Sequence, residues 1–299
     1  MRLLVLGSGA GGGLPQWNAP NENGRAAFGR DPLVPFRSQC SLAVSLDGFS
    51  WAILNAAPDL RQQIIANPQL HPRLPPRSTP IEAVLLTGAE IDQVTGLLCL
   101  RERQAFTIYG TLPTLAALAM NPIFEALSEV VTRTALTPDV PFEPLPGLKA
   151  TAIDLPGKAP LYLERTRPDP TRGEPGDCAG FVLESAGKRA VFAPGCARMT
   201  EALADACEGA DAVFFDGTLF TDDEMIRSGE GTKTGRRMGH MPMTGPGGAV
   251  EAFGQIRAGR KFFIHINNTN PALRYDSAER AALAAEGWAI AEDGMEISL

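Results

Sequence analysis

The chain has 299 residues, of which 44% are hydrophobic and 20% are charged, with a formal net charge of −7. This length and composition suffice for a buried core in a soluble globular protein. The acidic balance argues against nucleic acid as a partner, because no basic stripe is available for phosphate contacts. No apolar run approaches the roughly 18 residues of a membrane span, and the start MRLLVLGSG is more typical of a first strand than of a signal peptide. We therefore expect a cytoplasmic protein without a membrane segment.

Short aliphatic and aromatic runs bounded by Gly, Pro or Asp predict strands along the whole chain. The expected strands are Leu3–Leu6, Ser41–Ser45, Trp51–Leu54, Ala83–Leu86, Phe106–Tyr109, Lys149–Ile153, Phe181–Glu184, Ala190–Phe192, Ala212–Phe215, Lys261–Ile266 and Ala289–Leu299. Helical patterns are expected at Pro58–Ala66, Val94–Arg101, Pro113–Met120, Glu201–Cys207, Gly247–Ile256 and Ser277–Glu286. Near the end, Asp293-Gly294 lies between two apolar runs and predicts a hairpin.

Clusters of strands separated by helices predict an α/β fold in which two mixed sheets stack face to face beneath outer helices, an αββα sandwich. The Pro- and Gly-rich stretches are Gly11–Pro35, Leu70–Pro80 and Arg165–Gly176. We expect them to be loops of a single domain covering residues 1–299, because no repeat or low-complexity linker separates two parts.

The five cysteines are scattered and include no C-x-x-C pair. Neither a disulfide framework nor a zinc ribbon is therefore expected. Cys40 begins a strand-like run and Cys99 lies on an apolar helical pattern, so both are predicted to be core thiols.

The first strand runs into GSGAGGG at Gly7–Gly13, which contains G-x-G-x-x-G. A dinucleotide site would need a helix to begin there. The following Leu14–Pro20 contains two prolines and cannot begin that helix. We expect instead a loop whose backbone lies close to a ligand or to a neighbouring loop.

The segment Ala83–Glu102 combines a buried-strand pattern, a polar turn and a helical pattern. Glu90, Asp92 and Gln93 lie in the turn, where their side chains would face a cleft at the end of the sheet. A site with carboxylates and few imidazoles favours iron, manganese or magnesium over zinc. The alternative is a solvated helix cap with Asp92 near the helix N-terminus, and the residues alone leave the two interpretations even.

Two further predicted strands end in polar residues. Lys261–Ile266 carries His265 and continues into Asn267 and Asn268. A lone histidine in a core strand is more often a buried core residue than a ligand, but the dense polar patch after it raises the expectation of a ligand role. Ala212–Phe215 ends at Asp216.

A glycine-rich segment, Gly229–Gly248, carries Lys233, Arg236 and His240. It is typical of a loop that brings donors to a ligand. An ordinary surface loop is the alternative.

Taken together, these segments closely resemble the coenzyme PQQ synthesis protein B family, a branch of the metallo-β-lactamase superfamily. The matching motifs are GSGAGGGLPQWN at Gly7–Asn18, NAAPDLRQQI at Asn55–Ile64, TGLLCLRE at Thr95–Glu102, PGKAPLYLE at Pro156–Glu164, APGCARMTE at Ala193–Glu201, DGTLFTDDEMIRSGEGTKTGRRMGH at Asp216–His240 and HINNTNP at His265–Pro271. The resemblance implies a metallo-β-lactamase-like αββα fold and a role in making pyrroloquinoline quinone (PQQ). Two functions are attached to such proteins: iron-dependent hydroxylation of a tyrosine-bearing Glu–Tyr precursor, and carriage of PQQ or its precursor toward the periplasm.

The superfamily loads metal on an H-x-H-x-D-H motif, whose four ligand slots hold Gly88, Glu90, Asp92 and Gln93 here. The later ligand slots hold Lys158, after the Pro-Gly, and Gly195-Cys196. A second metal would therefore lack its ligands, which argues against two-metal hydrolysis.

The resemblance leaves a site for one divalent metal, which we expect to be Fe(II). Asp92 and His265 would bind it with Glu90 or Gln93 as a helper. Glu90 is a ligand or the base for phenol deprotonation. Asp216 would orient a group next to the metal.

The implied partners are the PQQ precursor or PQQ itself, bound with help from Lys233, Asn267 and Asn268. His240 and Arg236 would hold substrate carboxylates or assist proton transfer. Other PQQ-pathway proteins and a second copy in a homodimer are further expected partners.

The chain departs from many family members in two places. Their zinc-type C-x-C-x-x-C after Trp-Asn is replaced by Ala19–Asn23, so no structural zinc is expected. Where many members have His, this chain has Gln93, and a neutral amide should lower the metal affinity.

Overall fold

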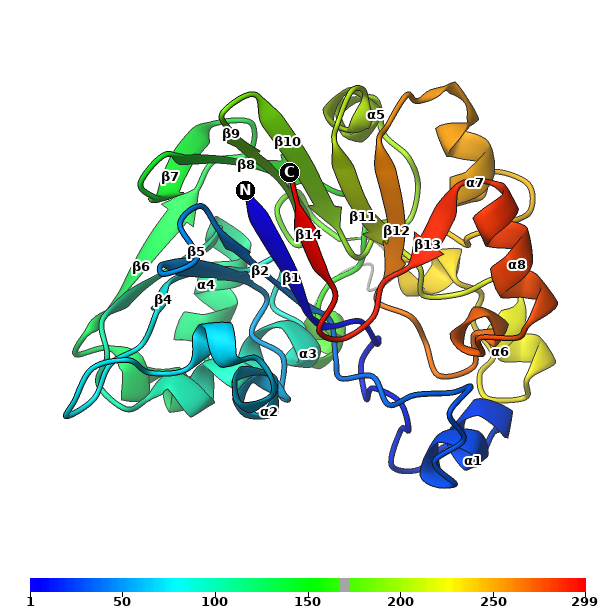
Figure 1. Ribbon diagram of the computed structural model, residues 1–299, viewed down its shortest axis with the longest axis horizontal. Helices are drawn as coiled ribbons and strands as arrows, with labels where there is room; N and C mark the ends of the chain where they lie inside the picture. Colours follow the sequence, from blue (N-terminus) through cyan, green and yellow to red (C-terminus); the bar gives the residue numbers. More distant parts are fainter. Residues whose placement is uncertain (167–172) are drawn as a thin grey trace.

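The computed structural model describes residues 1–166 and 173–299 and contains two seven-stranded sheets packed face to face (Figure 1). Of the predicted Arg165–Gly176 loop, residues 167–172 lie outside the described residues. The first sheet contains β1 (Arg2–Gly7), β2 (Ser41–Ser45), β3 (Trp51–Leu54), β4 (Ile81–Leu85), β5 (Phe106–Thr111), β6 (Val131–Leu136) and β14 (Glu296–Ser298). The second contains β7 (Pro141–Leu145), β8 (Leu148–Asp154), β9 (Ala179–Ser185), β10 (Lys188–Ala193), β11 (Ala212–Asp216), β12 (Arg260–Ile264) and β13 (Trp288–Ile290).

Helices cover the outer face of each sheet, so the predicted αββα sandwich is confirmed. The first sheet is covered by α2 (Leu60–Ala66), α3 (Ile91–Val94), α4 (Leu112–Ala119) and the 3-10 helices η1 (Pro68–Leu70), η2 (Thr95–Leu100) and η3 (Pro122–Leu127). The second is covered by α5 (Glu201–Cys207), α7 (Ala249–Ala252), η6 (Phe253–Gln255) and α8 (Ala278–Ala285). The remaining short helices are α1 (Glu22–Phe28), α6 (Glu224–Arg227), η4 (Leu161–Thr166), η5 (Arg236–Met238) and η7 (Pro271–Leu273). None of the helices in the described part of the chain has the length and apolar character needed to cross a membrane.

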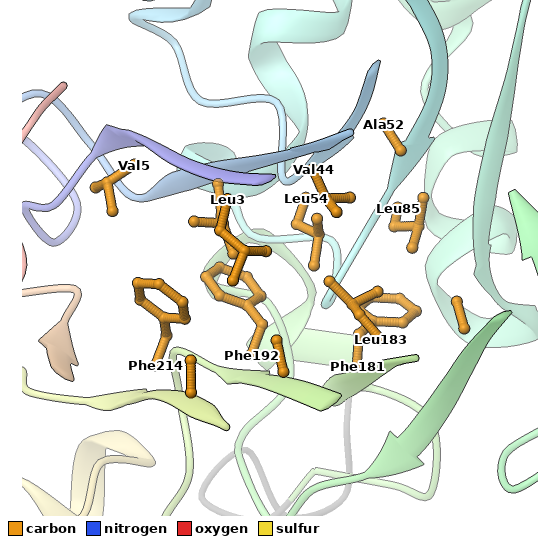
Figure 2. Packing of buried hydrophobic residues seen from close by; sticks show 14 of the residues in the cluster. Leu3, Val5, Val44, Ala52, Leu54, Leu85, Phe181, Leu183, Phe192 and Phe214 are labelled. Carbon is orange, nitrogen blue, oxygen red and sulfur yellow. The ribbon is translucent and has the colours of Figure 1, made fainter. Parts of the chain in front are cut away.

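The space between the sheets is filled by aliphatic and aromatic side chains from both inner faces (Figure 2). Leu3, Leu54 and Leu85 of the first sheet face Phe192 and Phe214 of the second, and all five are buried. Because successive strand residues point to opposite faces, the neighbours of these residues pack under the outer helices. Strands that are buried on both faces are apolar throughout, which explains why the sequence pattern predicted them.

Strands β3 to β6 run parallel in the first sheet, and β10 to β13 run parallel in the second. The carboxyl ends of parallel strands lie at one edge of a sheet, where open α/β sheets place their ligands. The polar residues that follow β4, β11 and β12 therefore meet at one end of the sandwich.

The predicted C-terminal hairpin is wrong. β13 pairs in parallel with β12 of the second sheet, whereas β14 pairs antiparallel with β1 of the first sheet. The carboxylate of Asp293 accepts hydrogen bonds from Ser8 and Ser38, so the Asp-Gly segment joins the two sheets and does not close a hairpin. Among the α-helices and strands of the described residues, the sequence pattern also missed α1, α6, β6 and β7.

The helix predicted at Val94–Arg101 begins earlier, at Ile91, and its α-helical part ends at Val94. The amide of Gly96 donates to Ala56 O at 2.8 Å, so the regular α-helical ladder stops here. A Cβ on Gly96 would lie 2.1 Å from Ala57 O, so glycine is required for this close approach. The tighter 3-10 turn that follows exposes Cys99, and its prediction as a core thiol is wrong.

Candidate metal centre and substrate cavity

A cavity of about 380 Å³ opens at the carboxyl ends of the parallel strands. Residues after β4, β10, β11 and β12 line it, together with Ala10 and Gly11 of the glycine-rich loop. That loop also pairs with the chain just after β12, where Ala10 N donates to Ile266 O at 2.8 Å. Its backbone therefore borders the cavity, and no helix begins directly after it, in agreement with the non-nucleotide interpretation.

Asp92 and His265 meet in this cavity although they belong to opposite sheets. Asp92 Oδ2 lies 3.2 Å from His265 Nε2, and both side chains are largely buried. Burial would lower the pKa of His265, but the hydrogen bond and the charge of Asp92 outweigh it and raise the pKa. Burial would likewise raise the pKa of Asp92, but His265 holds it below its usual value. Asp92 is thus part of a buried polar pair, and the solvated-cap alternative does not describe it.

The backbone of His265 adopts a left-handed conformation with φ 61°. Non-glycine residues rarely adopt this conformation, and such strain concentrates at functional sites. His265 follows β12 directly. The next residue, Ile266, donates a backbone hydrogen bond to Ser8 O at 2.9 Å. The sharp turn aims the imidazole at Asp92 while the chain continues to the glycine-rich loop.

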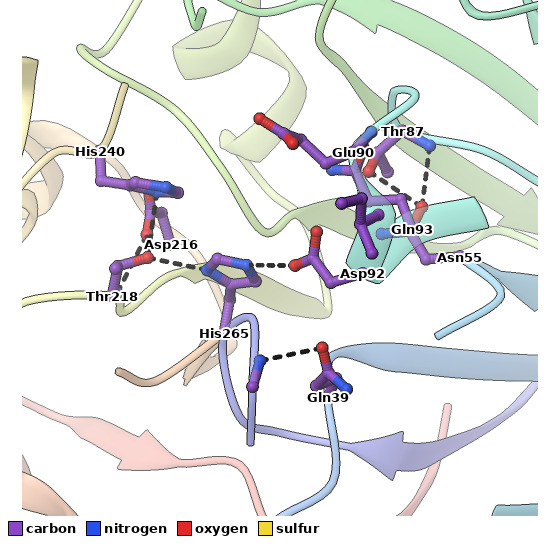
Figure 3. A network of polar contacts seen from close by, with 12 residues as sticks. Gln39, Asn55, Thr87, Glu90, Asp92, Gln93, Asp216, Thr218, His240 and His265 are labelled. Atoms are coloured by element: carbon purple, nitrogen blue, oxygen red, sulfur yellow. Dashed lines mark hydrogen bonds and ion pairs between the residues drawn. The ribbon is translucent and has the colours of Figure 1, made fainter. Parts of the chain in front are cut away.

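Thr218 fixes the orientation of the His265 ring. Its hydroxyl lies 2.8 Å from His265 Nδ1 and 2.7 Å from Asp216 Oδ1 (Figure 3). A carboxylate oxygen can only accept, so the hydroxyl donates to Asp216 and accepts from Nδ1–H of His265. Without a metal, Nε2–H of His265 donates to the Asp92 carboxylate. With its proton on Nδ1 only, a neutral ring would instead present an Nε2 lone pair beside Asp92. This is the form of histidine that binds metals.

Asp216 is fully buried at the end of β11 and hydrogen-bonded through both oxygens. His240 Nδ1 lies 2.8 Å from Asp216 Oδ2, and Cys196 N donates to the same oxygen at 2.9 Å. Burial would raise the pKa of Asp216, but the charge and hydrogen bond of His240 hold it below its usual value. Asp216, His240 and His265 place potential ligand atoms within 4.8 Å of one another. Because the Asp216 oxygens are already occupied, its geometry is that of an anchor for His240.

Glu90, two residues before Asp92, forms a charged trio with Lys158 and Glu164 at the wall of the cavity. Lys158 Nζ lies 3.2 Å from Glu90 Oε1 and 3.3 Å from Glu164 Oε1. Burial would lower the pKa of Lys158, but the two carboxylates outweigh it and raise the pKa. Gln93 also lines the cavity, but its amide oxygen accepts from Glu90 N at 3.0 Å at the start of α3.

The other predicted binding residues divide into two groups. Lys233 and Asn267 line the cavity. Arg236 and Asn268 do not: Arg236 donates to the carbonyls of the 246–247 turn, at 2.9 Å each, and Asn268 is buried against Gln16 and Asn21. The segment Ala19–Asn23 is thus tied to the chain after β12 by amide hydrogen bonds.

Sequence reasoning missed Thr218 and Glu164. Thr218 lies two residues after Asp216, and the sequence Asp-Gly-Thr at a strand end could have indicated it. Its role depends on the pairing of Asp216 with Ile264, which places the end of β11 beside His265. Glu164 carries no comparable signal, because its meeting with Lys158 depends on the course of η4.

Comparison with known proteins decides the family. The beta-lactamase superfamily domain matches residues 50–266. A coenzyme PQQ synthesis protein B from Methylorubrum populi is 49% identical over 300 residues, covering 100% of both chains. The protein of the same name from Gluconacetobacter diazotrophicus is 52% identical over 304 residues, covering 99% of each. The chain belongs to the coenzyme PQQ synthesis protein B family.

The structure agrees with membership of the coenzyme PQQ synthesis protein B family. The crystal structure of Zn²⁺-bound PqqB from Methylobacterium extorquens matches with a TM-score of 0.96 and 48% identity over 100% of both chains. A diphosphatase of the PhnP family, at 19% identity and a TM-score of 0.71 over 100% of this chain, shares the fold. The resemblance inferred from the end-to-end motifs is therefore confirmed.

Proposed function

We propose that this protein acts in PQQ biosynthesis as an Fe(II)-dependent hydroxylase of a tyrosine-bearing Glu–Tyr precursor. The observation that carries the proposal is the 3.2 Å approach of Asp92 Oδ2 to His265 Nε2 at the wall of a cavity. Two ligand atoms that share one metal, each about 2.1 Å from it, lie about 3 Å apart. Membership of the family supports the PQQ assignment.

The donors at this position suit a single divalent cation. A carboxylate and a neutral imidazole are oxygen and nitrogen ligands of the kind found in non-haem iron sites, which keep open positions. When bound, Fe(II) supplies the activation of dioxygen. Lys158 occupies the position where a two-metal hydrolase has a histidine ligand, and its ammonium would repel a second cation.

Asp216 and His240 form a proton-transfer pair in this proposal. Asp216 accepts from His240 Nδ1, which leaves Nε2 of His240 without a protein partner among the described residues. The ring lies stacked beside His265, with centroids 5.2 Å apart. His240 can therefore take a proton from, or return it to, a phenol bound in front of His265.

Glu90 and Gln93 contribute less to metal binding than Asp92 and His265. Glu90 Oε1 pairs with Lys158, and Glu90 Oε2 accepts from Leu161 N at 3.2 Å. The oxygen of Gln93 is used at the helix start. We therefore assign Asp92 and His265 as the metal ligands and leave Glu90 to face the substrate.

The test is anaerobic reconstitution with Fe(II), followed by the Glu–Tyr precursor and oxygen, with ring hydroxylation read by mass spectrometry. Asp92→Ala and His265→Ala should each abolish turnover and lower the bound iron. The matched controls are Asp205→Ala and His71→Ala, at exposed positions outside the cavity. Full turnover by either ligand variant would contradict the assignment.

A carrier for PQQ or its precursor is the alternative function. The cavity volume lies within the range of small-molecule sites and suits either role. Tight PQQ binding with no turnover at any iron loading would favour the carrier. Turnover that requires Asp92 and His265 would exclude a protein that only carries.

A further inference from the structure

We infer that Glu90, Lys158 and Glu164 form a subsite for the charged head group of an α-amino acid or dipeptide, which turns the aromatic end of the substrate toward Asp92 and His265. This inference rests on the proposed function for the identity of the aromatic end. It assigns the recognition of substrate polarity to three cavity-lining residues, of which Glu90 lies in the same turn as the metal ligand Asp92.

The trio alternates negative, positive and negative charges along one wall. Lys158 Nζ lies between the two carboxylates, at 3.2 Å from Glu90 and 3.3 Å from Glu164. The side chains remain 20–26% exposed, and all three residues line the cavity. They are therefore sheltered enough for strong charge–charge interactions and open enough for a ligand to reach them.

The scaffold holds these charges in place without the help of a ligand. Glu90 Oε2 accepts from Leu161 N at 3.2 Å, and the hydroxyl of Tyr162 donates to Ala89 O at 2.8 Å. These two contacts attach η4 to the turn before α3. The relative positions of Glu90 and Glu164 are thus set by the fold, as a binding subsite requires.

The backbone just before Lys158 is tightly packed against Cys178. A Cβ on Gly157 would lie 2.3 Å from Cys178 Sγ, so only glycine fits there. The close packing of Gly157 fixes where the Lys158 side chain enters the cavity.

The charges complement an amino-acid head group. An ammonium has three donors, and Glu90 and Glu164 account for two of them, so Lys158 has one donor for a substrate carboxylate. The two glutamates can accept from the substrate ammonium. A ligand with both groups satisfies the trio, whereas a ligand with one of them leaves a charged group of the trio unmatched.

The test compares three ligands that share a phenol ring: L-tyrosine, tyramine, which lacks the carboxylate, and 3-(4-hydroxyphenyl)propionate, which lacks the ammonium. Their dissociation constants are measured by calorimetry on the metal-free protein and on variants. A charge-assisted hydrogen bond corresponds to about a 10- to 100-fold change in affinity. Native protein should prefer L-tyrosine to both analogues by this factor.

Lys158→Met should remove the preference for L-tyrosine over tyramine, and Glu164→Gln should reduce the preference over the propionate. Lys158→Arg, which keeps the charge, should retain a preference. The control is Lys149→Met, because Lys149 forms its ion pair with Glu184 outside the cavity. Melting temperatures establish that each variant is folded.

Equal binding of all three ligands by native protein, or an unchanged preference in folded Lys158→Met, would overturn the inference. If Lys158→Met does not fold, the native ligand series and Lys158→Arg decide in the same way. The binding assay uses no iron and no turnover. If the protein prefers L-tyrosine to both analogues but does not hydroxylate the precursor, only the hydroxylase proposal is refuted. If it hydroxylates the precursor but shows no such preference, only the subsite is refuted.

Discussion

The hydroxyl of Thr218 lies 2.8 Å from Nδ1 of His265 and 3.0 Å from Nδ1 of His240. One threonine thus contacts both histidines of the cavity and, through its proton, the buried Asp216. Nδ1 of each histidine ring is therefore hydrogen-bonded within the protein. Of the other two nitrogens, Nε2 of His265 lies 3.2 Å from Asp92, and Nε2 of His240 has no protein partner among the described residues.

Removing this hydroxyl should weaken metal binding. Thr218→Val keeps the shape of the side chain but cannot accept from Nδ1–H of His265, so Fe(II) affinity should fall about 10- to 100-fold. Thr218→Ser should restore it. Anaerobic metal titration gives the affinity, and Thr221→Val, on the exposed loop that follows, is the control. Native-like affinity in Thr218→Val would show that the ring is oriented by other contacts.

Gln93→His should raise the affinity for divalent metal by about tenfold or more, because an imidazole is a better ligand than an amide. The same change removes the hydrogen bond from Glu90 N to the Gln93 amide oxygen. Loss of this cap should cost about 1 kcal/mol, so the metal-free variant should melt at a lower temperature. Metal content and melting curves measure the two effects separately, and unchanged metal affinity would mean that residue 93 faces away from the ion.

Glu224 should make stability depend on pH. Burial raises the pKa of this carboxyl from 4.5 to about 7. The folded protein then binds a proton that the unfolded chain releases, so the free energy of unfolding falls as the pH rises from 4.5 to about 7. The loss amounts to about 3 kcal/mol.

Glu224→Gln should remove this slope and be more stable than the native protein above pH 7. Urea unfolding at a series of pH values measures it. The exposed Glu22→Gln serves as the control. A variant with the native slope would assign the pH dependence to other groups.

Gly96→Ala should destabilise the protein by ~2 kcal/mol or more, because the new methyl group would meet the backbone of the 56–57 segment. The displaced turn directly follows α3, which carries Asp92, so metal affinity should fall as well. Gly254→Ala, where no atom lies within 4 Å of the added Cβ, should be close to neutral. Thermal unfolding compares the two, and equal melting temperatures would contradict the close packing described for η2.

Most of the fold could be predicted because the central strands are apolar on both faces. The meeting of Asp92 with His265 was predicted from the family resemblance, and it follows from the fold because β4 and β12, although in different sheets, end at the same end of the sandwich. Sequence patterns fail where long-range contacts decide. The Asp-Gly pair near the C-terminus resembles a hairpin turn, but the carboxylate of Asp293 binds Ser8 and Ser38 instead.

The same limit applies to the site. Arg236 was predicted to bind substrate, but its guanidinium is satisfied by backbone carbonyls that follow it along the chain. No sequence motif by itself marks Thr218 as a residue of the site. Its importance comes from the register of β11 and β12, which no local pattern contains.

The pairing of β14 with β1 has a consequence for biosynthesis. On the ribosome, β1 is made well before its outer neighbour β14, because the whole second sheet lies between them in the chain. Until then the nascent chain carries an open strand edge, to which another chain could add. Completion of the first sheet therefore comes late, after the second sheet has been made, and the period before it is when the polypeptide is most exposed to aggregation.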